Sequence, residues 1–458
     1  MCRKRATKII IACDGTWQSA STGDDGIPTD VAALCGALST HKFSRRSRKK
    51  HNQIVFYQSG VGSGLSTSFE TIIDGAFGEG LEQNAREAYL FLAENYTQGD
   101  EIYLFGFSRG AYTARTIAAF IGTIGVLSAA GAIHFKDLYN MYTSTKGPRA
   151  WQESLRMYMV ENRLDETAWR TPPDKVIIKI VGCWETVGAL GVPSNWLAEF
   201  FHTNDKYQFL NMQVPPRVEY SFHALALDEH RASFYPAIWW LDPKAQRIHD
   251  ANGNVIKPKL AQCWFPGHHN DVGGNEPNRK IANLALAWIV DECRKTGHLE
   301  FDQNYLKSIL APTRNQVVTS WLDGAKDPFY AGFLPSRFWS FLGSRVRQPA
   351  NESFQDGIRP ATKSSRTFEF IHYSVREKAD EIGKQRYENE DCEECATFMF
   401  KGGAPSRALI GYKFDNGAWV KDLPDCERME IPEFPPPDVE DEASMQAYLS
   451  SNWLRQQH

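Results

Sequence analysis

A serine between two glycines, directly after a short apolar run, is the feature of this sequence with the clearest chemical potential. Ser108 stands in LFGFSRGAYT, with Gly106 two positions before it and Gly110 two positions after it. A serine hydroxyl becomes a useful nucleophile only when a base removes its proton. It must also project from a sharp strand-to-helix turn, which crowds the positions that the two glycines occupy. The pattern indicates a nucleophilic serine, and its alternative is a turn serine that caps a helix.

The segments on either side of this serine have the patterns that such a turn needs. Residues 101–107, EIYLFGF, form an apolar run typical of a buried strand, and residues 110–125 have helical spacing. A helix that begins just after the serine directs its first amides and the positive end of its dipole at that position. The backbone amide of Arg109 is therefore the expected donor to an oxyanion.

A base and a carboxylate follow the serine in α/β hydrolases, in the order serine, acid, histidine. Two adjacent histidines, His268 and His269, come after the apolar part of CWFPGHHNDVGG, and Asp271 follows them. Glu185 comes directly after the strongest apolar run, at 174–184, where a carboxylate would orient an imidazole. The alternatives are a turn histidine with a structural role and a glutamate paired with a surface base.

The first apolar run of the chain ends in CDGTW, which is the expected source of a second oxyanion donor. In this fold the donor comes from a loop after an early strand. We predict that it is the backbone amide of Gly15 or of Thr16. Asp14 either holds this loop by hydrogen bonds or faces the substrate.

Strand-like and helix-like patterns alternate through the first three hundred residues. Apolar runs occupy 8–15, 53–60, 101–107, 174–184 and 262–267, and helical patterns occupy 77–96, 110–125 and 280–297. This alternation predicts an α/β fold, α/β-hydrolase-like, with a mostly parallel sheet and helices on both faces. A ligand site is then expected at the carboxyl ends of the strands. The residues that fall there are Asp14, Ser108, Glu185 and His269.

The pattern changes in the last third of the chain. We expect residues 1–310 to form the catalytic core with insertions, and residues 311–458 to form a C-terminal extension with a last strand near 368–377. The Asn-Gly pair within 408–421 predicts a hairpin. Three aromatic segments either complete the core or form a cap with an apolar channel for an acyl chain; they lie at 196–202, 234–241 and 329–342.

The composition argues against several classes of protein. The net charge of −4, from 51 basic and 55 acidic residues, is not that of a nucleic-acid-binding protein. Nine cysteines without framework spacing indicate free thiols in a reducing compartment. No apolar stretch reaches the roughly 18 residues of a membrane-spanning helix. We therefore expect a cytoplasmic protein that contacts a membrane surface only transiently, and its oligomeric state is left open.

Several motifs in a fixed order resemble one known family. They are CDGTWQ, TDVAAL, YQSGVGSG, GAFGEGL, GFSRGAYTAR, CWETVGALG, HALALDEHR and WFPGHHNDVGG, within residues 8–300, with a trace at 371–377. Together they resemble an α/β-hydrolase-like family of largely uncharacterised bacterial and fungal proteins. That family includes the first class of type VI secretion lipase effectors, which are phospholipases.

The resemblance implies roles for three residues. The family's elbow serine corresponds to Ser108, and the histidine of its G-x-H-x-D-V-G-G motif corresponds to His269, which leaves His268 in a variable position. The family's W-D-T-V-G aspartate falls on Glu185, a departure that displaces the carboxylate by one methylene. Glutamate is the third member of the triad in some α/β hydrolases. Asp271 is either an alternative acid or a residue that shapes the turn.

Other residues are more readily explained by structural roles. HALALDEHR, at 223–231, has the character of a helix that packs near the site. His372 is a second candidate for the base. Cys392 and Cys395 form a C-x-x-C pair without the second pair that zinc requires, so no metal site is expected.

These observations predict a serine hydrolase that cleaves a carboxylic ester, such as the acyl ester of a phospholipid, through an acyl-enzyme. Ser108 is the nucleophile, His269 the base and Glu185 the residue that orients the base, and this chemistry requires no cofactor. The alternatives are a thioesterase, lactonase or amidase on the same fold, or a non-catalytic protein that binds a ligand.

Overall fold

The computed structural model describes most of the first 310 residues and shorter segments beyond them. The described residues are 6–15, 28–38, 52–60, 79–145, 147–165, 168–187, 212–242, 248–250, 253–274, 276, 278–310, 346–349, 366–378, 380, 406–409, 413–422, 428–434 and 446. Thr16, the C-x-x-C pair and the aromatic segments at 196–202 and 329–342 lie outside these residues.

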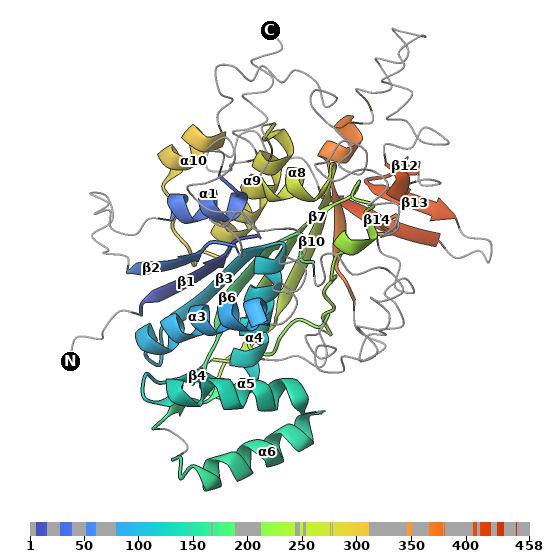
Figure 1. The fold of residues 1–458 in the computed structure, drawn as a ribbon. Helices are drawn as coiled ribbons and strands as arrows, with labels where there is room; N and C mark the ends of the chain where they lie inside the picture. The colour runs from blue at the N-terminus through green and yellow to red at the C-terminus, as the bar shows by residue number, and fades with distance from the viewer. Residues whose placement is uncertain are drawn as a thin grey trace.

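A ten-stranded sheet runs through the described part of the chain, and eight of its strands pair in parallel (Figure 1). The parallel strands are, in order across the sheet, β2 (Gln53–Gln58), β1 (Lys8–Cys13), β3 (Glu101–Phe107), β6 (Ile178–Trp184), β7 (Val218–Ala226), β10 (Lys259–Phe265), β11 (Glu369–His372) and β14 (Arg428–Phe434). The antiparallel strands β13 (Ala418–Asp422) and β12 (Lys413–Asp415) follow at the edge.

Helices cover both faces of this sheet. One face carries α3 (Glu79–Asn95), α4 (Arg109–Ile124), α5 (Phe135–Ser144) and α6 (Pro148–Glu161). The other carries α1 (Asp30–Ala37), α8 (His269–Gly273), α9 (Lys280–Lys295) and α10 (Gln303–Leu310). Alternate residues of β1 face opposite ways, so Ile9 and Ile11 join the first core cluster and Ile10 joins the second. The predicted α/β-hydrolase-like fold is confirmed.

The central strands form because their sequences are nearly continuous apolar runs. Such runs suit parallel strands that are buried on both faces. In β1, KIIIAC, five of the six residues are buried, and in β3, EIYLFGF, six of the seven are buried. Two short antiparallel pairs, β4 (Val126–Leu127) with β5 (Arg170–Thr171) and β8 (Ile248–His249) with β9 (Val255–Ile256), lie outside the main sheet.

The prediction of a helix at 223–231 is wrong. His223 lies within strand β7, and the residues after Ala226 form the turn that leaves this strand. The strand lies between β6 and β10, and eight of its nine residues are buried. A short, continuous apolar run has no periodicity that distinguishes a buried strand from a buried helix, and the position in the sheet decides.

Two strand pairings follow the catalytic part of the chain. β11 lies parallel to β10, within the range where a last strand was expected, but it is not the last, because β14 pairs with it further on. Asn416 and Gly417 form the turn between β12 and β13, as the Asn-Gly pair predicted.

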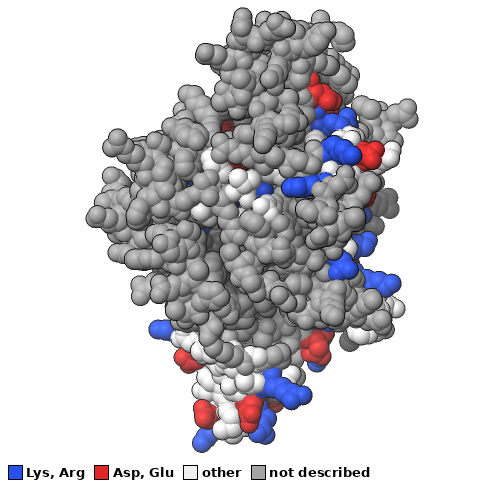
Figure 2. Space-filling model, turned by 90° about the vertical axis from the view of Figure 1, so that its right-hand side faces the viewer, with Lys and Arg blue, Asp and Glu red and all other residues white. Residues whose placement is uncertain are grey.

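Helices α5 and α6 lie together at the bottom of the molecule in the view of Figure 1, away from β12, β13 and β14 at the right. In the view of Figure 2, the described surface at this end carries basic and acidic side chains side by side. None of the helices in the described residues is both long and apolar enough to cross a membrane.

Candidate active site

Ser108 occupies the sharp turn between β3 and α4. Its backbone has φ 56° and ψ −121°, a conformation that non-glycine residues rarely adopt. A side chain at Gly106 would lie 2.4 Å from the carbonyl oxygen of Gly110, and one at Gly110 would lie 2.1 Å from the carbonyl oxygen of Cys13. Gly106 therefore allows close packing against the first turn of α4, and Gly110 allows close packing against the end of β1. The strained turn presents the Ser108 hydroxyl beyond the end of the sheet.

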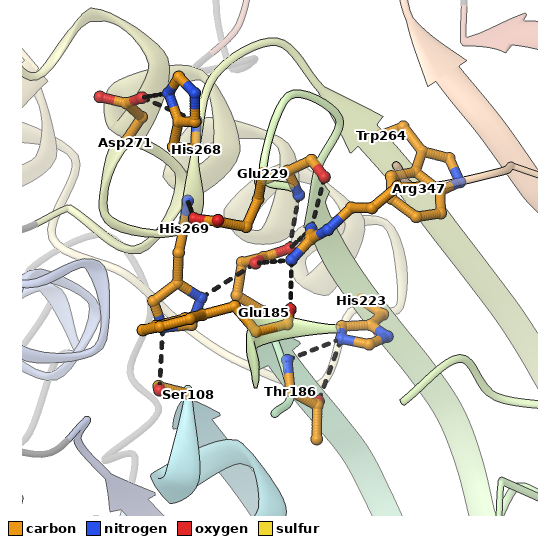
Figure 3. Close-up of polar contacts among 12 residues, drawn as sticks. Ser108, Glu185, Thr186, His223, Glu229, Trp264, His268, His269, Asp271 and Arg347 are labelled. Atoms are coloured by element: carbon orange, nitrogen blue, oxygen red, sulfur yellow. Dashed lines mark hydrogen bonds and ion pairs between the residues drawn. The ribbon is translucent and has the colours of Figure 1, made fainter. Parts of the chain in front are cut away.

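His269 lies beside this hydroxyl. It begins helix α8, shortly after β10 ends, and its Nε2 atom lies 2.9 Å from Ser108 Oγ (Figure 3). The imidazole packs against the rings of Phe107 and Phe234, with centroid distances of 4.9 and 4.8 Å. Burial lowers the pKa of His269, although the hydrogen bond with Glu185 opposes this effect. A neutral imidazole is the form that accepts a proton from serine.

Glu185 completes the chain of hydrogen bonds. Its Oε2 atom lies 3.0 Å from His269 Nδ1, and its side chain is buried. A carboxylate only accepts hydrogen bonds, so the proton of the imidazole lies on Nδ1 and Nε2 is left to accept from the Ser108 hydroxyl. The three residues can therefore move a proton away from Ser108.

The topology of the sheet explains why these distant residues meet. Ser108 follows β3, Glu185 follows the adjacent strand β6, and His269 follows β10, which is separated from β6 by β7. All four strands are parallel, so their carboxyl ends lie at one edge.

A second set of hydrogen bonds holds the turn that carries Glu185. Glu185 itself has a positive φ of 47°, and its amide donates to the carbonyl of Ala224. The amide of the next residue, Thr186, donates to Nε2 of His223 at 3.2 Å. His223 must then carry its proton on Nδ1, which lies 3.2 Å from Gln262 Oε1. Burial, together with the charge of Arg115, lowers the pKa of His223 to about 3.

Arg347 contacts both oxygens of Glu185. Its Nη1 atom donates to Oε1 at 2.6 Å and its Nη2 atom donates to Oε2 at 2.8 Å (Figure 3). The amide of Ala226 also donates to Oε1, at 2.6 Å. Burial by itself would raise the pKa of Glu185, but the Arg347 charge and the hydrogen bond with His269 outweigh it and bring this pKa to about 2.

Glu229 holds the backbone of the histidine from the other side. The amide of His269 donates to Glu229 Oε2 at 3.3 Å, while Arg231 donates to both oxygens of Glu229, at 2.9 and 2.6 Å. Glu229 is buried, and although burial raises its pKa, the charge of Arg231 holds this pKa well below its ordinary value.

His268 and Asp271 shape the turn and stay apart from the serine. The amide of His268 donates to Asp271 Oδ2 at 2.7 Å, and the His268 ring lies 3.4 Å from the same oxygen. Burial lowers the pKa of His268, but the bond to Asp271 and the charge of Glu229 raise it overall. Of the two roles considered for Asp271, the geometry favours the shaping of the turn.

Asp14 holds its own loop, the first of its two predicted roles. Its carboxylate accepts from the Thr29 hydroxyl and the Tyr57 hydroxyl, both at 2.6 Å, and from the amide of Gly15 at 2.7 Å. The amide of Gly15, one of the two predicted oxyanion donors, is bound to Asp14 in this structure, and its role as an oxyanion donor stays a prediction. Thr16, the alternative donor, lies outside the described residues.

Arg109 begins helix α4, so its amide belongs to the first turn, which a helix leaves without an internal acceptor. Its guanidinium is largely buried, and within the described residues its Nε atom has no hydrogen-bond partner. Burial lowers the pKa of Arg109 to about 10, so the side chain is a cation at neutral pH.

His372 does not replace His269. Its Nδ1 atom lies 2.8 Å from Ser374 Oγ and its Nε2 atom lies 3.1 Å from Gln446 Oε1. Burial lowers the pKa of His372 to about 3. Both ring nitrogens are thus occupied away from Ser108.

Sequence reasoning missed three residues of the site: Glu229, Arg231 and Arg347. The first two lie in the quoted DEHR motif, whose concentrated charge was a usable signal. Arg347 gives no comparable signal, because it lies in a part of the chain without helical or strand periodicity.

Comparisons with known proteins give the family of this chain. The sequence model of the family described as "T6SS, Phospholipase effector Tle1-like, catalytic domain" matches residues 7–292. The protein YEL023C of Saccharomyces cerevisiae, described as uncharacterised, is 29% identical over 194 residues, which are 40% of this chain and 26% of that protein.

Solved structures with similar folds include an uncharacterised protein from Pseudomonas aeruginosa, with 17% identity and a TM-score of 0.38 over 66% of this chain and 47% of that chain. Another is the Tle1 effector bound to the VgrG spike of the type 6 secretion system, with 20% identity and a TM-score of 0.30 over 59% of this chain and 51% of that chain. The chain thus spans about a quarter of the yeast protein and about half of each solved chain. Because the family match covers more than half of its residues, the protein belongs to the family of Tle1-like phospholipase effector catalytic domains.

Proposed function

We propose that this protein hydrolyses a carboxylic ester through an acyl-enzyme on Ser108. The observation that carries the proposal is the continuous series of hydrogen bonds from Ser108 Oγ to His269 and from His269 to Glu185, at 2.9 and 3.0 Å. Such a series makes a serine nucleophilic at neutral pH. The family match supports the same class of reaction.

The reaction proceeds in two halves. Ser108 Oγ attacks the ester carbonyl while its proton moves to His269 Nε2, and the amide of Arg109 donates to the oxyanion. The imidazolium, stabilised by Glu185, gives this proton to the departing alcohol, which leaves an acyl-serine. A water molecule then gives a proton to His269 and attacks the acyl group, and the return of that proton to Ser108 releases the acid.

The acyl ester of a glycerophospholipid is the substrate that we propose. The family description supports it, and so does the Arg109 cation, which directly follows the nucleophile in the chain, because a guanidinium binds phosphate through charge-assisted hydrogen bonds. Action in the cytoplasm, with transient contact to a lipid surface, is part of this proposal. A thioester, lactone or amide would use the same three residues.

A fluorophosphonate probe tests the nucleophile, because it forms a stable bond only with an activated serine. We expect the wild-type protein to be labelled and Ser108→Ala to remain unlabelled. Ser144→Ala, which removes an exposed hydroxyl at the end of α5, is the matched control and should be labelled like the wild type.

Two outcomes would count against the proposal. If the folded wild-type protein is not labelled, Ser108 is not an activated nucleophile. If it is labelled but releases no fatty acid from phospholipid vesicles, while it cleaves p-nitrophenyl esters or thioesters, the reaction class stands and the phospholipid is not the substrate.

A further inference from the structure

The guanidinium that pairs with Glu185 belongs to a residue outside the part of the chain that the family model matches. The family match ends at residue 292, whereas Arg347 lies in the described segment 346–349, 162 positions after Glu185. Arg347 is almost fully buried, with 1% of its side chain exposed, and Glu185 is fully buried. A buried ion pair at the acid of the site therefore joins the C-terminal third of the chain to the catalytic residues.

We propose that Arg347 is a positioning residue for the reaction: its guanidinium orients the Glu185 carboxylate toward His269 and neutralises part of the charge that His269 faces. This inference rests on the proposed function of Ser108, His269 and Glu185. It assigns to the C-terminal part of the chain a direct effect on the basicity of the catalytic histidine.

The geometry of Arg347 supports a positioning role. Its two terminal nitrogens reach four acceptors: both oxygens of Glu185, the carbonyl of Ala226 at 2.5 Å and the carbonyl of Phe234 at 2.7 Å. Ala226 ends strand β7, and the ring of Phe234 packs on the His269 imidazole. Arg347 thus holds the carboxylate of Glu185 and also the backbone of Phe234, whose ring packs on the imidazole. The planar guanidinium, with its several N–H donors, suits these four acceptors.

The long side chain of Glu185 fits this arrangement. One oxygen, Oε2, accepts from His269 Nδ1 and from Arg347 Nη2, while Oε1 accepts from the Ala226 amide and from Arg347 Nη1. A shorter aspartate at this position would withdraw its carboxylate by about one bond length. A glutamate and its arginine partner therefore act here as one unit.

The charge of Arg347 also affects the proton affinity of His269. Because the guanidinium and the imidazole share Oε2, the positive charge weakens the attraction between Glu185 and a protonated His269. Loss of this charge should raise the pH at which His269 takes up a proton. The other charged and titratable groups around His269 are Glu229, Arg231, His268 and Asp271, and none of them would be changed.

Three variants test this role in the full-length protein. Arg347→Met removes the charge and the fork, Arg347→Lys keeps the charge but not the fork, and Lys179→Met is the matched control. Lys179 pairs with Glu219 at 2.7 Å, near the start of β6, while Glu185 follows the end of that strand. The measurement is the rate of fluorophosphonate labelling as a function of pH, together with kcat/KM for a p-nitrophenyl ester.

We expect Arg347→Met to move the acid-side midpoint of the labelling rate upward by about one pH unit, as the loss of a neighbouring positive charge does. Its maximal rate should fall about 10- to 100-fold, because the acid is no longer held in place. Arg347→Lys should keep a midpoint near that of the wild type but lose rate. Lys179→Met should keep both the midpoint and the rate.

Equal midpoints in Arg347→Met, Arg347→Lys and wild type would overturn the inference and leave Arg347 as a structural residue. If Arg347→Met does not fold, a wild-type rate in Arg347→Lys would overturn it. NMR titration of the histidine rings in the Ser108→Ala background measures the shift of His269 without any activity. An unlabelled wild type with a shifted His269 in Arg347→Met would therefore contradict the proposed function and not the role of Arg347.

Discussion

Ser108 Oγ and His269 Nε2 lie 2.9 Å apart, although 161 positions separate the two residues in the chain. The two residues follow different strands, which are not consecutive in the sequence. They meet because β3 and β10 are parallel strands of one sheet whose carboxyl ends lie at the same edge. The residues around this pair can each be tested by a substitution.

The two adjacent histidines should differ sharply in their effect on activity. His269→Ala removes the base, so we expect kcat to fall by about 10⁴-fold or more. His268→Ala should change kcat less than about tenfold and lower the free energy of unfolding by about 1 kcal/mol, since it removes a ring that contacts Asp271 at the start of α8. Ester hydrolysis and chemical denaturation measure the two effects, and the reverse ranking in kcat would show that His268 is the base.

Glu185→Gln should lose activity and change how stability depends on pH. An amide no longer selects the correct imidazole tautomer, so we expect kcat to fall by about 10⁴-fold. The folded pKa of Glu185, about 2, lies below its ordinary value of 4.5. The ionised carboxylate therefore stabilises the wild type above about pH 4.5, and this contribution is lost as the pH falls toward 2.

Denaturant unfolding of wild type and Glu185→Gln at pH 7 and pH 3 measures this linkage. The difference in free energy of unfolding between the two proteins should shrink at the lower pH. A difference that stays constant or grows would contradict the ionised, paired state of Glu185.

The activity of the wild type should persist into mildly acidic conditions. His269 must be neutral to accept the proton of Ser108, and burial lowers its pKa. The acid-side midpoint of kcat/KM is therefore expected below the ordinary histidine value of about 6.5, with activity present above it and lost as the pH falls through it. The rate for a p-nitrophenyl ester between pH 4.5 and 8 gives this midpoint, and a value above 7 would contradict the prediction.

Arg109→Met should distinguish charged from neutral substrates. The substitution keeps the backbone amide that donates to the oxyanion but removes the cation, so the KM for a phospholipid is expected to rise about 10- to 100-fold. The KM for a neutral p-nitrophenyl ester should change less than about twofold. Equal effects on both substrates would show that the guanidinium does not bind the phosphate.

Gly110→Ala should destabilise the whole protein. A methyl group there would lie 2.1 Å from the carbonyl oxygen of Cys13 and 2.5 Å from that of Asp14, and both are backbone atoms of the packed β1 segment. We expect a loss of roughly 3 kcal/mol in the free energy of unfolding, which thermal unfolding would detect. Gly99→Ala is a comparison without a steric clash: no atom lies within 4 Å of a methyl group at that position, but its φ of 100° still imposes backbone strain.

Much of the fold could be predicted because the responsible patterns are local. β1, β3 and β6 are continuous apolar runs, and α3 and α9 have clear helical spacing, so their positions follow from hydrophobic periodicity. Strand β7 was assigned to a helix because its apolar run has neither period. Only its place between β6 and β10 establishes what it is.

The residues of the site also differ in how far the sequence predicts them. Ser108 was identifiable because its turn requires Gly106 and Gly110 at fixed distances along the chain, which is a local constraint. The acceptor of the Gly15 amide could not be predicted, because it is the Asp14 side chain, whose orientation depends on Thr29 and Tyr57.

The amino-acid sequence by itself therefore determined the fold class, the serine turn and the order of serine, glutamate and histidine, since each depends on spacing along the chain. The tertiary structure alone decided which groups surround them. Arg347 contacts Glu185 across 162 positions, and no pattern in the sequence records that contact. Burial then changes the chemistry of the pair, because two charges removed from water must neutralise each other.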